Sequence, residues 1–242
     1  MGLGIADALA LRGIAVTIAD INVQGIERVI ESRSDRYFGV TLDVRDRTAW
    51  AEAKAKAESV FGAVDILVNN AGIGPDGKEF ADLVPDSFDR LMSVDLTGVL
   101  NGIVTFAATL RAQGAGYIVN NASIVGLVSG VPGMGPYAAA KAGVVAMSEV
   151  LRMEMAPHGV GVSVLCPGPV ATDFATTTIR EGGATSDRWA HLKRMNASAV
   201  GECVVRGIES DEAYILTHPE YRAAFDQRAS SIGDAFLRQT PS

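Results

Sequence analysis

Short apolar runs rich in β-branched residues alternate along the chain with longer segments of helical periodicity. The apolar runs are typical of strands that are buried on both faces of a sheet, and they cover residues 15–19, 66–68, 117–119 and 161–165. The helical segments cover approximately residues 3–12, 22–33, 46–61, 86–113 and 136–157. The alternation predicts an α/β fold in which a doubly wound parallel sheet lies between two layers of helices.

No linker, repeat or shift of composition divides the 242 residues. The pattern therefore predicts a single domain over residues 1–242, since large α/β units reach this length. Residues 173–200 are more polar and less periodic than the rest. We expect this segment to form a substrate loop over a site.

Composition excludes several classes of protein. A net charge of −7 and a pI near 5.0 argue against nucleic acid or an anionic membrane surface as a partner. No apolar span of about 20 residues and no secretory leader is evident, so a cytoplasmic protein is expected. Cys166 and Cys203 lack metal-ligand spacing, and the histidines form no ligand motif. We expect no metal site, and two reduced, buried cysteines.

Candidate chemistry centres on Tyr137 and Lys141, which one helical turn places on the same helix face. A free tyrosine has a pKa of about 10, and a nearby ammonium lowers that pKa towards the range useful for proton transfer. A hydroxyl from Ser123 can hold a substrate oxygen beside the phenol. The same spacing also occurs in ordinary surface pairs, so this motif alone leaves both interpretations open.

Other unusual residues follow the predicted strands, where doubly wound sheets bind their ligands. Asp20 can accept hydrogen bonds from both ribose hydroxyls of an adenine dinucleotide, and Asp43-Val44 can flank an adenine ring. A plain turn aspartate and a helix N-cap ahead of Thr48 are the respective alternatives. The further turns allow close backbone approach to a flat ligand, and they comprise Asn69-Asn70-Ala71-Gly72 and Pro167-Gly168-Pro169-Val170-Ala171-Thr172.

Taken together, these motifs resemble the single-domain branch of the short-chain dehydrogenase/reductase family from Met1 to about residue 173. The resemblance implies a Rossmann-like fold and NAD(P)-dependent oxidoreduction of a secondary alcohol or ketone. It implies that Tyr137 is the general acid/base, that Lys141 lowers its pKa and binds the nicotinamide ribose, and that Ser123 orients the substrate oxygen. The implied cofactor-binding residues are Gly2, Asp20, Asp43, Val44, Asn70, Ala71, Gly72, Tyr137, Lys141, Pro167, Gly168, Val170 and Thr172.

The start of the chain departs from the family pattern. Family members open with a strand and a Thr-Gly-x-x-x-Gly-x-Gly turn, whereas this sequence opens Met1-Gly2-Leu3-Gly4, with Gly2 matching the last glycine. We expect the first strand and most of the phosphate-binding loop to be missing from this chain. A start codon assigned too late and a truly truncated chain both explain this pattern. Either would leave two strands with unpaired edges.

A second departure is Asp95, where the family usually has an asparagine that supports a proton-relaying water. We include Asp95 among the catalytic candidates. Its carboxylate can pair with Lys141 directly, or raise the pKa values of Lys141 and Tyr137 through space.

Asp20, with no Arg or Lys at 21–24, favours NAD over NADP. The residues expected around the cleft carry few charges, which suggests a small, fairly apolar alcohol or ketone, although core packing explains them equally well; they are Ile124, Val125, Val128, Val131, Met134 and Phe174.

The helical segments at 86–113 and 136–157 are small or apolar on more than one face. With the resemblance, this predicts a homodimer or homotetramer. The residues that suggested it are Gly98, Gly102, Ala107, Ala108, Gly143, Ala146 and Met147. The alternative function is a catalytically impaired member that acts as a binding or assembly subunit.

Overall fold

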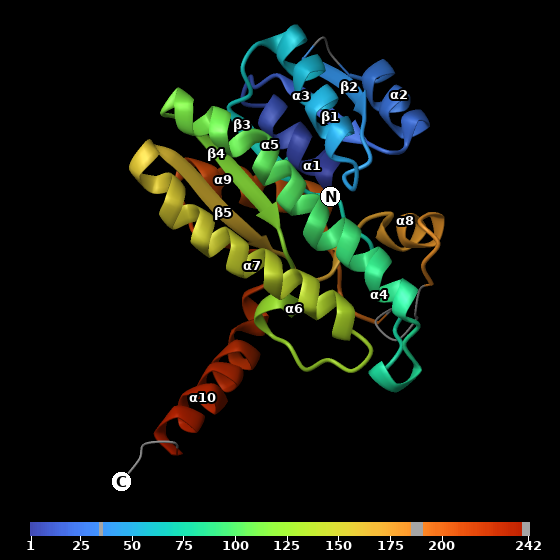
Figure 1. Ribbon diagram of the computed structural model, residues 1–242, viewed down its shortest axis with the longest axis vertical. Helices are drawn as coiled ribbons and strands as arrows, with labels where there is room; N and C mark the ends of the chain where they lie inside the picture. Colours follow the sequence, from blue (N-terminus) through green and yellow to red (C-terminus); the bar gives the residue numbers. More distant parts are fainter. Residues whose placement is uncertain (34–35, 185–190, 239–242) are drawn as a thin grey trace.

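The computed structural model describes residues 1–33, 36–184 and 191–238 (Figure 1). The largest sheet is parallel and has the strand order β3-β4-β5-β8, with bounds Ile66–Asn69, Gly116–Asn121, Val160–Cys166 and Tyr214–Leu216. A separate parallel pair joins β1 (Val16–Asp20) to β2 (Tyr37–Thr41). A third pair joins β6 (Val170–Ala171) to β7 (Met195–Asn196).

Helices cover both faces of the sheets. The described residues form two large hydrophobic cores and a smaller one. The helices packed in the two large cores are α1 (Gly2–Ala10), α3 (Arg47–Phe61), α5 (Gly98–Gln113), α7 (Gly135–Met155) and α9 (Ala197–Glu209). The others are α2 (Val23–Glu31), α4 (Pro85–Met92), α6 (Ile124–Leu127), α8 (Phe174–Arg180) and α10 (Arg222–Arg238). The last of these extends away from the body (Figure 1). The predicted three-layer, Rossmann-like fold is confirmed.

Alternate residues of the central strand β4 build the two cores. Ile118 packs in the core that contains α3, α5 and α7, whereas Tyr117 and Val119 pack in the core that contains α1 and α9. This division follows from the two-residue period of a strand. It also explains why the strand sequences are apolar on both faces.

The open strand edges expected from the sequence are present. In the described part of the chain, β1 pairs only with β2, and β3 has β4 as its only strand partner. Val16 and Ile18 of β1 line the same cavity as Ile66 and Val68 of β3. A strand placed between them would therefore find hydrogen-bonding partners on both sides.

A continuous helical stretch runs from α4 through a π-helical turn, Ser93–Thr97, into α5. The sequence predicted no apolar span, but Pro85–Gln113 contains an 18-residue window with a mean hydropathy of 1.5, which is long and apolar enough to cross a membrane by length and composition alone. Half of its most apolar window is buried in the protein, as is usual for a core helix. The stretch packs on the sheet through residues such as Val99 and Phe106.

Three glycines taken as signs of a subunit interface instead serve packing within the chain. A Cβ on Gly102 would lie 2.1 Å from Asn69 Oδ1, and one on Gly98 would lie 2.7 Å from Val44 Cγ2. A Cβ on Gly143 would lie 2.8 Å from Leu96 Cδ1. Packing within the chain thus accounts for these three glycines, and the predicted subunit interface stays a prediction.

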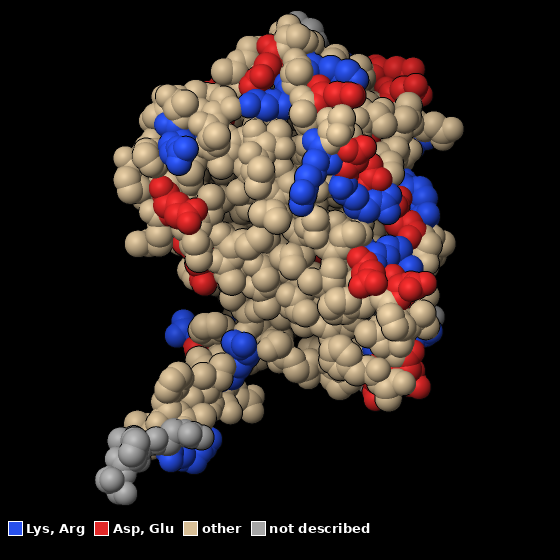
Figure 2. Space-filling model, viewed as in Figure 1, with Lys and Arg blue, Asp and Glu red and all other residues tan. Residues whose placement is uncertain are grey.

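Apolar side chains are nevertheless exposed on the outer faces of the same helices. Val104 of α5 is 69% exposed, and Val150 and Met153 of α7 are 58% and 77% exposed. Figure 2 shows a broad uncharged area over the middle of the face that carries these helices.

The cysteines agree with the prediction in part. Cys166 and Cys203 form no disulfide, and Cys166 is buried, which raises the pKa of its thiol to about 12. Cys203, predicted to be buried, is only half-buried, at the margin of the core that contains α1 and α9.

Candidate active site

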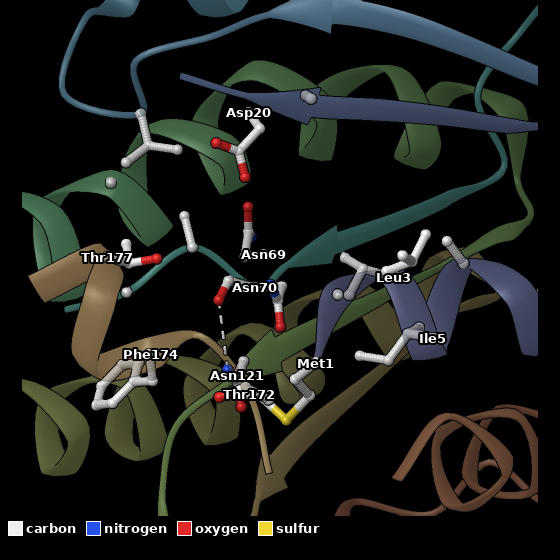
Figure 3. Close-up of a pocket in the computed structure, with 18 of the residues that line it drawn as sticks. Met1, Leu3, Ile5, Asp20, Asn69, Asn70, Asn121, Thr172, Phe174 and Thr177 are labelled. Atoms are coloured by element: carbon white, nitrogen blue, oxygen red, sulfur yellow. Dashed lines mark hydrogen bonds between the residues drawn. The ribbon is translucent and has the colours of Figure 1, made fainter. Parts of the chain in front are cut away.

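A cavity of about 1520 Å³ runs from the space between β1 and β3 to the carboxyl ends of β3, β4 and β5. Figure 3 shows Asp20 at one part of its wall, Asn69 and Asn70 near the middle, and Thr172 and Phe174 beyond them. Ser123, Tyr137 and Lys141 line the same cavity, so residues distant in sequence meet here. The apolar cleft residues predicted from the sequence also line it: Ile124, Val125, Val128, Val131, Met134 and Phe174.

The most buried charged pair of the site joins Lys141 and Asp95. Lys141 Nζ lies 3.0 Å from Asp95 Oδ2, and the two residues are only 1% and 0% exposed. Asp95 belongs to the π-helical turn between α4 and α5, a distortion often found at functional sites. The direct pairing expected from the sequence is confirmed.

The second carboxylate oxygen of Asp95 organises the loop after β3. Asp95 Oδ1 accepts a hydrogen bond of 2.8 Å from the backbone N–H of Ile73. The adjacent Gly72 has little room for a side chain, since its Cβ would lie 3.2 Å from Asp95 Oδ2 and 3.4 Å from Lys141 Nζ. Asp95 thus connects the Asn-Asn-Ala-Gly loop to the candidate catalytic lysine.

The ammonium of Lys141 has a defined place between the sheet and the phenol. Its Nζ donates to the carbonyl of Asn121 at 3.2 Å and lies 5.6 Å from the centre of the Tyr137 ring. Ser123 caps helix α6, where its Oγ accepts from the N–H of Val125 at 3.3 Å. These positions bring the three predicted catalytic side chains to one wall of the cavity.

The sequence predicted that Lys141 lowers the pKa of Tyr137, but the surroundings of the phenol change the net result. Burial raises the pKa of the phenol, Lys141 lowers it, Asp95 raises it, and hydrogen bonding to Ser123 lowers it, so that the net pKa is above its ordinary value. Burial lowers the pKa of Lys141, but Asp95 and Tyr137 together raise it by more, so that the pKa of Lys141 is above its usual value. Burial also raises the pKa of Asp95, against the opposing effect of Lys141. Lys141 therefore acts on Tyr137 in the predicted direction but does not determine the net shift.

At the end nearest β1, Asp20 is exposed and borders the cavity, and its Oδ1 accepts from Asn22 N at 2.8 Å. Asp43 also borders the cavity but pairs with Arg45, whose Nη2 lies 2.6 Å from Asp43 Oδ2. Hydrogen bonding to Arg45 holds the pKa of Asp43 below its usual value. Asp46 caps α3, so the alternative of Asp43 as its N-cap was wrong.

Val44 joins the neighbouring helices to this end of the cavity. Its carbonyl accepts hydrogen bonds from Trp50 Nε1 at 3.0 Å and from Asn101 Nδ2 at 2.9 Å. The Val44 side chain packs against Gly98 and borders the cavity.

Within the described residues, the ends of β3 and β4 and the loop after β3 carry acceptors without partners. Asn69 Nδ2 donates to Asn120 Oδ1 at 2.8 Å, and Asn121 Nδ2 donates to the Asn70 carbonyl at 3.4 Å, the dashed line in Figure 3. The side-chain oxygens of Asn69, Asn70 and Asn121 are buried without a hydrogen-bond partner in the described structure. Ala71, Gly72 and Gly2 line the same stretch, and Gly2 approaches the Asn70 amide so closely that a Cβ would lie 2.7 Å from Nδ2.

The predicted turn after β5 also reaches the cavity, with Pro167, Gly168, Val170 and Thr172 in its wall. The Pro167 carbonyl accepts from the N–H of Ile124 at 2.9 Å, which ties the turn to the helix that Ser123 caps.

The predicted substrate loop begins with α8, which lies against the site. Phe174 stacks edge-on to Tyr137, with ring centres 6.2 Å apart, and Thr178 Oγ1 accepts from Gly74 N at 2.7 Å. Residues 185–190 of this loop lie outside the described residues.

Sequence reasoning missed several contributors to the site. The carbonyl of Asn121 and the N–H of Ile73 are backbone groups, which carry no signature of their own. The polar pair Asn120-Asn121 shortly before Ser123 was the available signal for the Asn121 side chain. Tyr221 joins the cavity from the segment after β8, far from any motif.

The model for the short chain dehydrogenase family matches residues 1–182. A C alpha-dehydrogenase of Sphingobium sp. is 30% identical over 252 residues, which cover 97% of this chain and 82% of that protein. The chain belongs to the short-chain dehydrogenase family. It is accordingly an oxidoreductase of that family.

Solved members of the short-chain dehydrogenase family share the fold over nearly the whole chain. A short chain dehydrogenase/reductase of Burkholderia phymatum, in complex with NAD, has a TM-score of 0.88 and 27% identity, covering 100% of this chain and 92% of its own. An alcohol dehydrogenase of Thermococcus sibiricus, complexed with 5-hydroxy-NADP, has a TM-score of 0.74 and 25% identity, covering 89% and 90%.

Proposed function

We propose that the protein is an NAD-dependent oxidoreductase that transfers a hydride between nicotinamide and a secondary alcohol or ketone. The observation that carries the proposal is the Lys141 ammonium, buried beside the Tyr137 ring at the wall of a large cavity. A buried ammonium next to a phenol favours the phenolate, which is what proton exchange with an alcohol oxygen requires.

In the proposed mechanism, Tyr137 takes the hydroxyl proton of an alcohol, or gives a proton to the oxygen of a ketone. Ser123 holds that oxygen beside the phenol, and Lys141 stabilises the phenolate. Asp95 holds Lys141 in place and limits how far its charge lowers the pKa of Tyr137. A bound nicotinamide accepts or supplies the hydride.

The cavity fits a dinucleotide by the chemistry of its wall. The unpartnered oxygens of Asn69, Asn70 and Asn121 offer buried acceptors to the hydroxyl or amide donors of such a ligand. Relatives solved with NAD and with 5-hydroxy-NADP support a nicotinamide cofactor. On this proposal, Asp20 binds the adenine ribose and Lys141 the nicotinamide ribose.

Replacing Asp20 with serine is expected to reduce the preference for NAD over NADP. The exposed carboxylate repels a 2′-phosphate, and the pairing of Arg45 with Asp43 leaves that guanidinium engaged elsewhere. We expect the ratio of kcat/KM for NAD to that for NADP to fall at least about tenfold, or about 1.4 kcal/mol. Steady-state kinetics with both cofactors measure this ratio, and Asp46→Ser, at the start of α3, is the control. An unchanged ratio would contradict the assignment of Asp20.

Alcohol oxidation is expected to become faster as pH rises through neutrality, because the phenolate of Tyr137 is the active form and its pKa lies above the ordinary value. Asp95→Asn removes a negative charge that raises this pKa, so the rising limb should move to lower pH. The asparagine oxygen can still accept from Ile73. Profiles of kcat against pH for both proteins test the shift, and superimposable profiles would refute a role for Asp95.

The substrate we propose is small and fairly apolar. Val128, Val131 and Met134 line the same cavity as Tyr137, and Phe174 packs on the Tyr137 ring. A panel of neutral secondary alcohols with NAD, matched by carboxylate analogues of equal size, tests both the reaction and this preference. Oxidation of no neutral alcohol would contradict the proposed reaction.

We further propose a homodimer or homotetramer formed through the exposed apolar face of α5 and α7. Val104, Val150 and Met153 lie on this face, which is otherwise largely uncharged (Figure 2). Light scattering of the purified chain tests this, and a monomer would contradict it.

One observation favours a second candidate, a catalytically impaired member that acts as a binding or assembly subunit. The Asp95 carboxylate offsets the Lys141 charge that would otherwise activate Tyr137. This candidate predicts no turnover in the unaltered chain, whereas the main proposal predicts both cofactor binding and turnover.

A further inference from the structure

His218 lies buried behind the turn that forms the far wall of the cavity. It follows β8 and precedes the short 3-10 helix Pro219–Tyr221. Its ring contacts the turn at two backbone groups. Gly168 N lies 3.1 Å from Nδ1, and the Pro169 carbonyl lies 3.2 Å from Nε2.

These two partners define the protonation of the imidazole ring. The N–H of Gly168 can only donate, so Nδ1 accepts, and the carbonyl of Pro169 can only accept, so Nε2–H donates. The Thr217 hydroxyl is also within hydrogen-bond distance of Nδ1, at 2.7 Å. A neutral imidazole with its proton on Nε2 thus forms hydrogen bonds to two consecutive residues of the turn, Gly168 and Pro169.

The turn and the ring are also matched in shape. A Cβ on Gly168 would lie 2.7 Å from His218 Cγ, so the chain can pass over the imidazole only as glycine. The Pro169 carbonyl accepts a second hydrogen bond, of 2.9 Å, from Met195 N at the start of β7. His218 therefore joins β8 to the turn just where Val170 and Thr172 enter the cavity wall.

From this geometry we infer that His218 is a positioning residue, which holds the turn at 167–169 so that Val170 and Thr172 meet the nicotinamide end of the cofactor. This inference rests on the proposed function, since it assigns that end of the cavity to nicotinamide. It predicts that His218 affects ligands that carry nicotinamide and has little effect on those that carry only the adenine half.

The test compares His218→Phe, which keeps a ring but loses both hydrogen bonds, with His158→Phe at an exposed histidine. Calorimetry gives the affinity of each protein for NADH and for ADP-ribose, which lacks nicotinamide. We expect His218→Phe to weaken NADH about tenfold, as the loss of hydrogen bonds predicts, and to leave ADP-ribose unchanged. His218→Asn and His218→Gln can each keep one of the two hydrogen bonds, so their affinity for NADH should lie between that of the unaltered chain and that of His218→Phe. They also keep the test possible if the phenylalanine variant does not fold.

Amide hydrogen exchange in the absence of any ligand measures how firmly His218 holds the turn at 167–169. The Gly168 amide should exchange faster in His218→Phe, while amides in the middle of β5 should not change. Equal weakening of NADH and ADP-ribose, or unchanged exchange at Gly168, would overturn the inference. If the unaltered chain binds neither ligand, the proposed function fails, and the exchange of Gly168 still decides whether His218 anchors the turn.

Discussion

Replacing Tyr137 with phenylalanine is expected to lower the rate of alcohol oxidation about 10²–10⁴-fold while cofactor binding is retained. The substitution removes only the phenol oxygen, so the ring can still pack against Phe174 and lie beside Lys141. Single-turnover formation of NADH measures the rate of the chemical step, and calorimetry measures the affinity for the cofactor.

Tyr221→Phe is the matched control, because Tyr221 lines the same cavity but lies on the segment after β8. We expect this variant to keep most of the activity. Comparable rates for Tyr137→Phe and the unaltered chain would show that Tyr137 is not the proton-transfer group. Parallel losses in both tyrosine variants would indicate a change of cavity shape instead.

Replacing Asp95 with alanine is expected to lower the free energy of unfolding by about 3–5 kcal/mol, because it leaves the buried Lys141 ammonium without its carboxylate. The loss of the acceptor for the Ile73 N–H adds to the effect. Urea unfolding of the two proteins at the same pH measures the difference.

The double variant Asp95→Ala/Lys141→Met separates the charge effect from packing. Removing both partners of a buried ion pair is often neutral or stabilising, so the double variant should regain much of the stability lost in Asp95→Ala. A double variant that is no more stable than Asp95→Ala would show that the buried charge is not the cause of the loss.

Strands β3, β4 and β5 could be predicted because burial on both faces gives each of them a nearly continuous apolar run. Strand β1 was predicted from its apolar sequence, although it is only half-buried and its last two residues are exposed. Strands β6 and β7 could not, since each has two residues whose strand geometry comes from pairing with the other. Strand β8 has three residues at the edge of the sheet, too few to show a period.

The meeting of Ser123, Tyr137 and Lys141 at one site was predictable from helical spacing and from the position of ligand sites in doubly wound sheets. The net pKa of Tyr137 was not, because it depends on burial, which no motif encodes. The packing roles of Gly98 and Gly102 within the chain could not be predicted either, because they depend on tertiary contacts. Their neighbours, Val44 and Asn69, lie far away in sequence.

The most direct test of the account is calorimetric titration of NADH into the 242-residue chain, in the unaltered form and as Asp20→Ala. We predict saturable binding of one NADH per chain, which Asp20→Ala weakens. No saturable binding of either NADH or NADPH by the unaltered chain would contradict the claim that this cavity holds a nicotinamide cofactor.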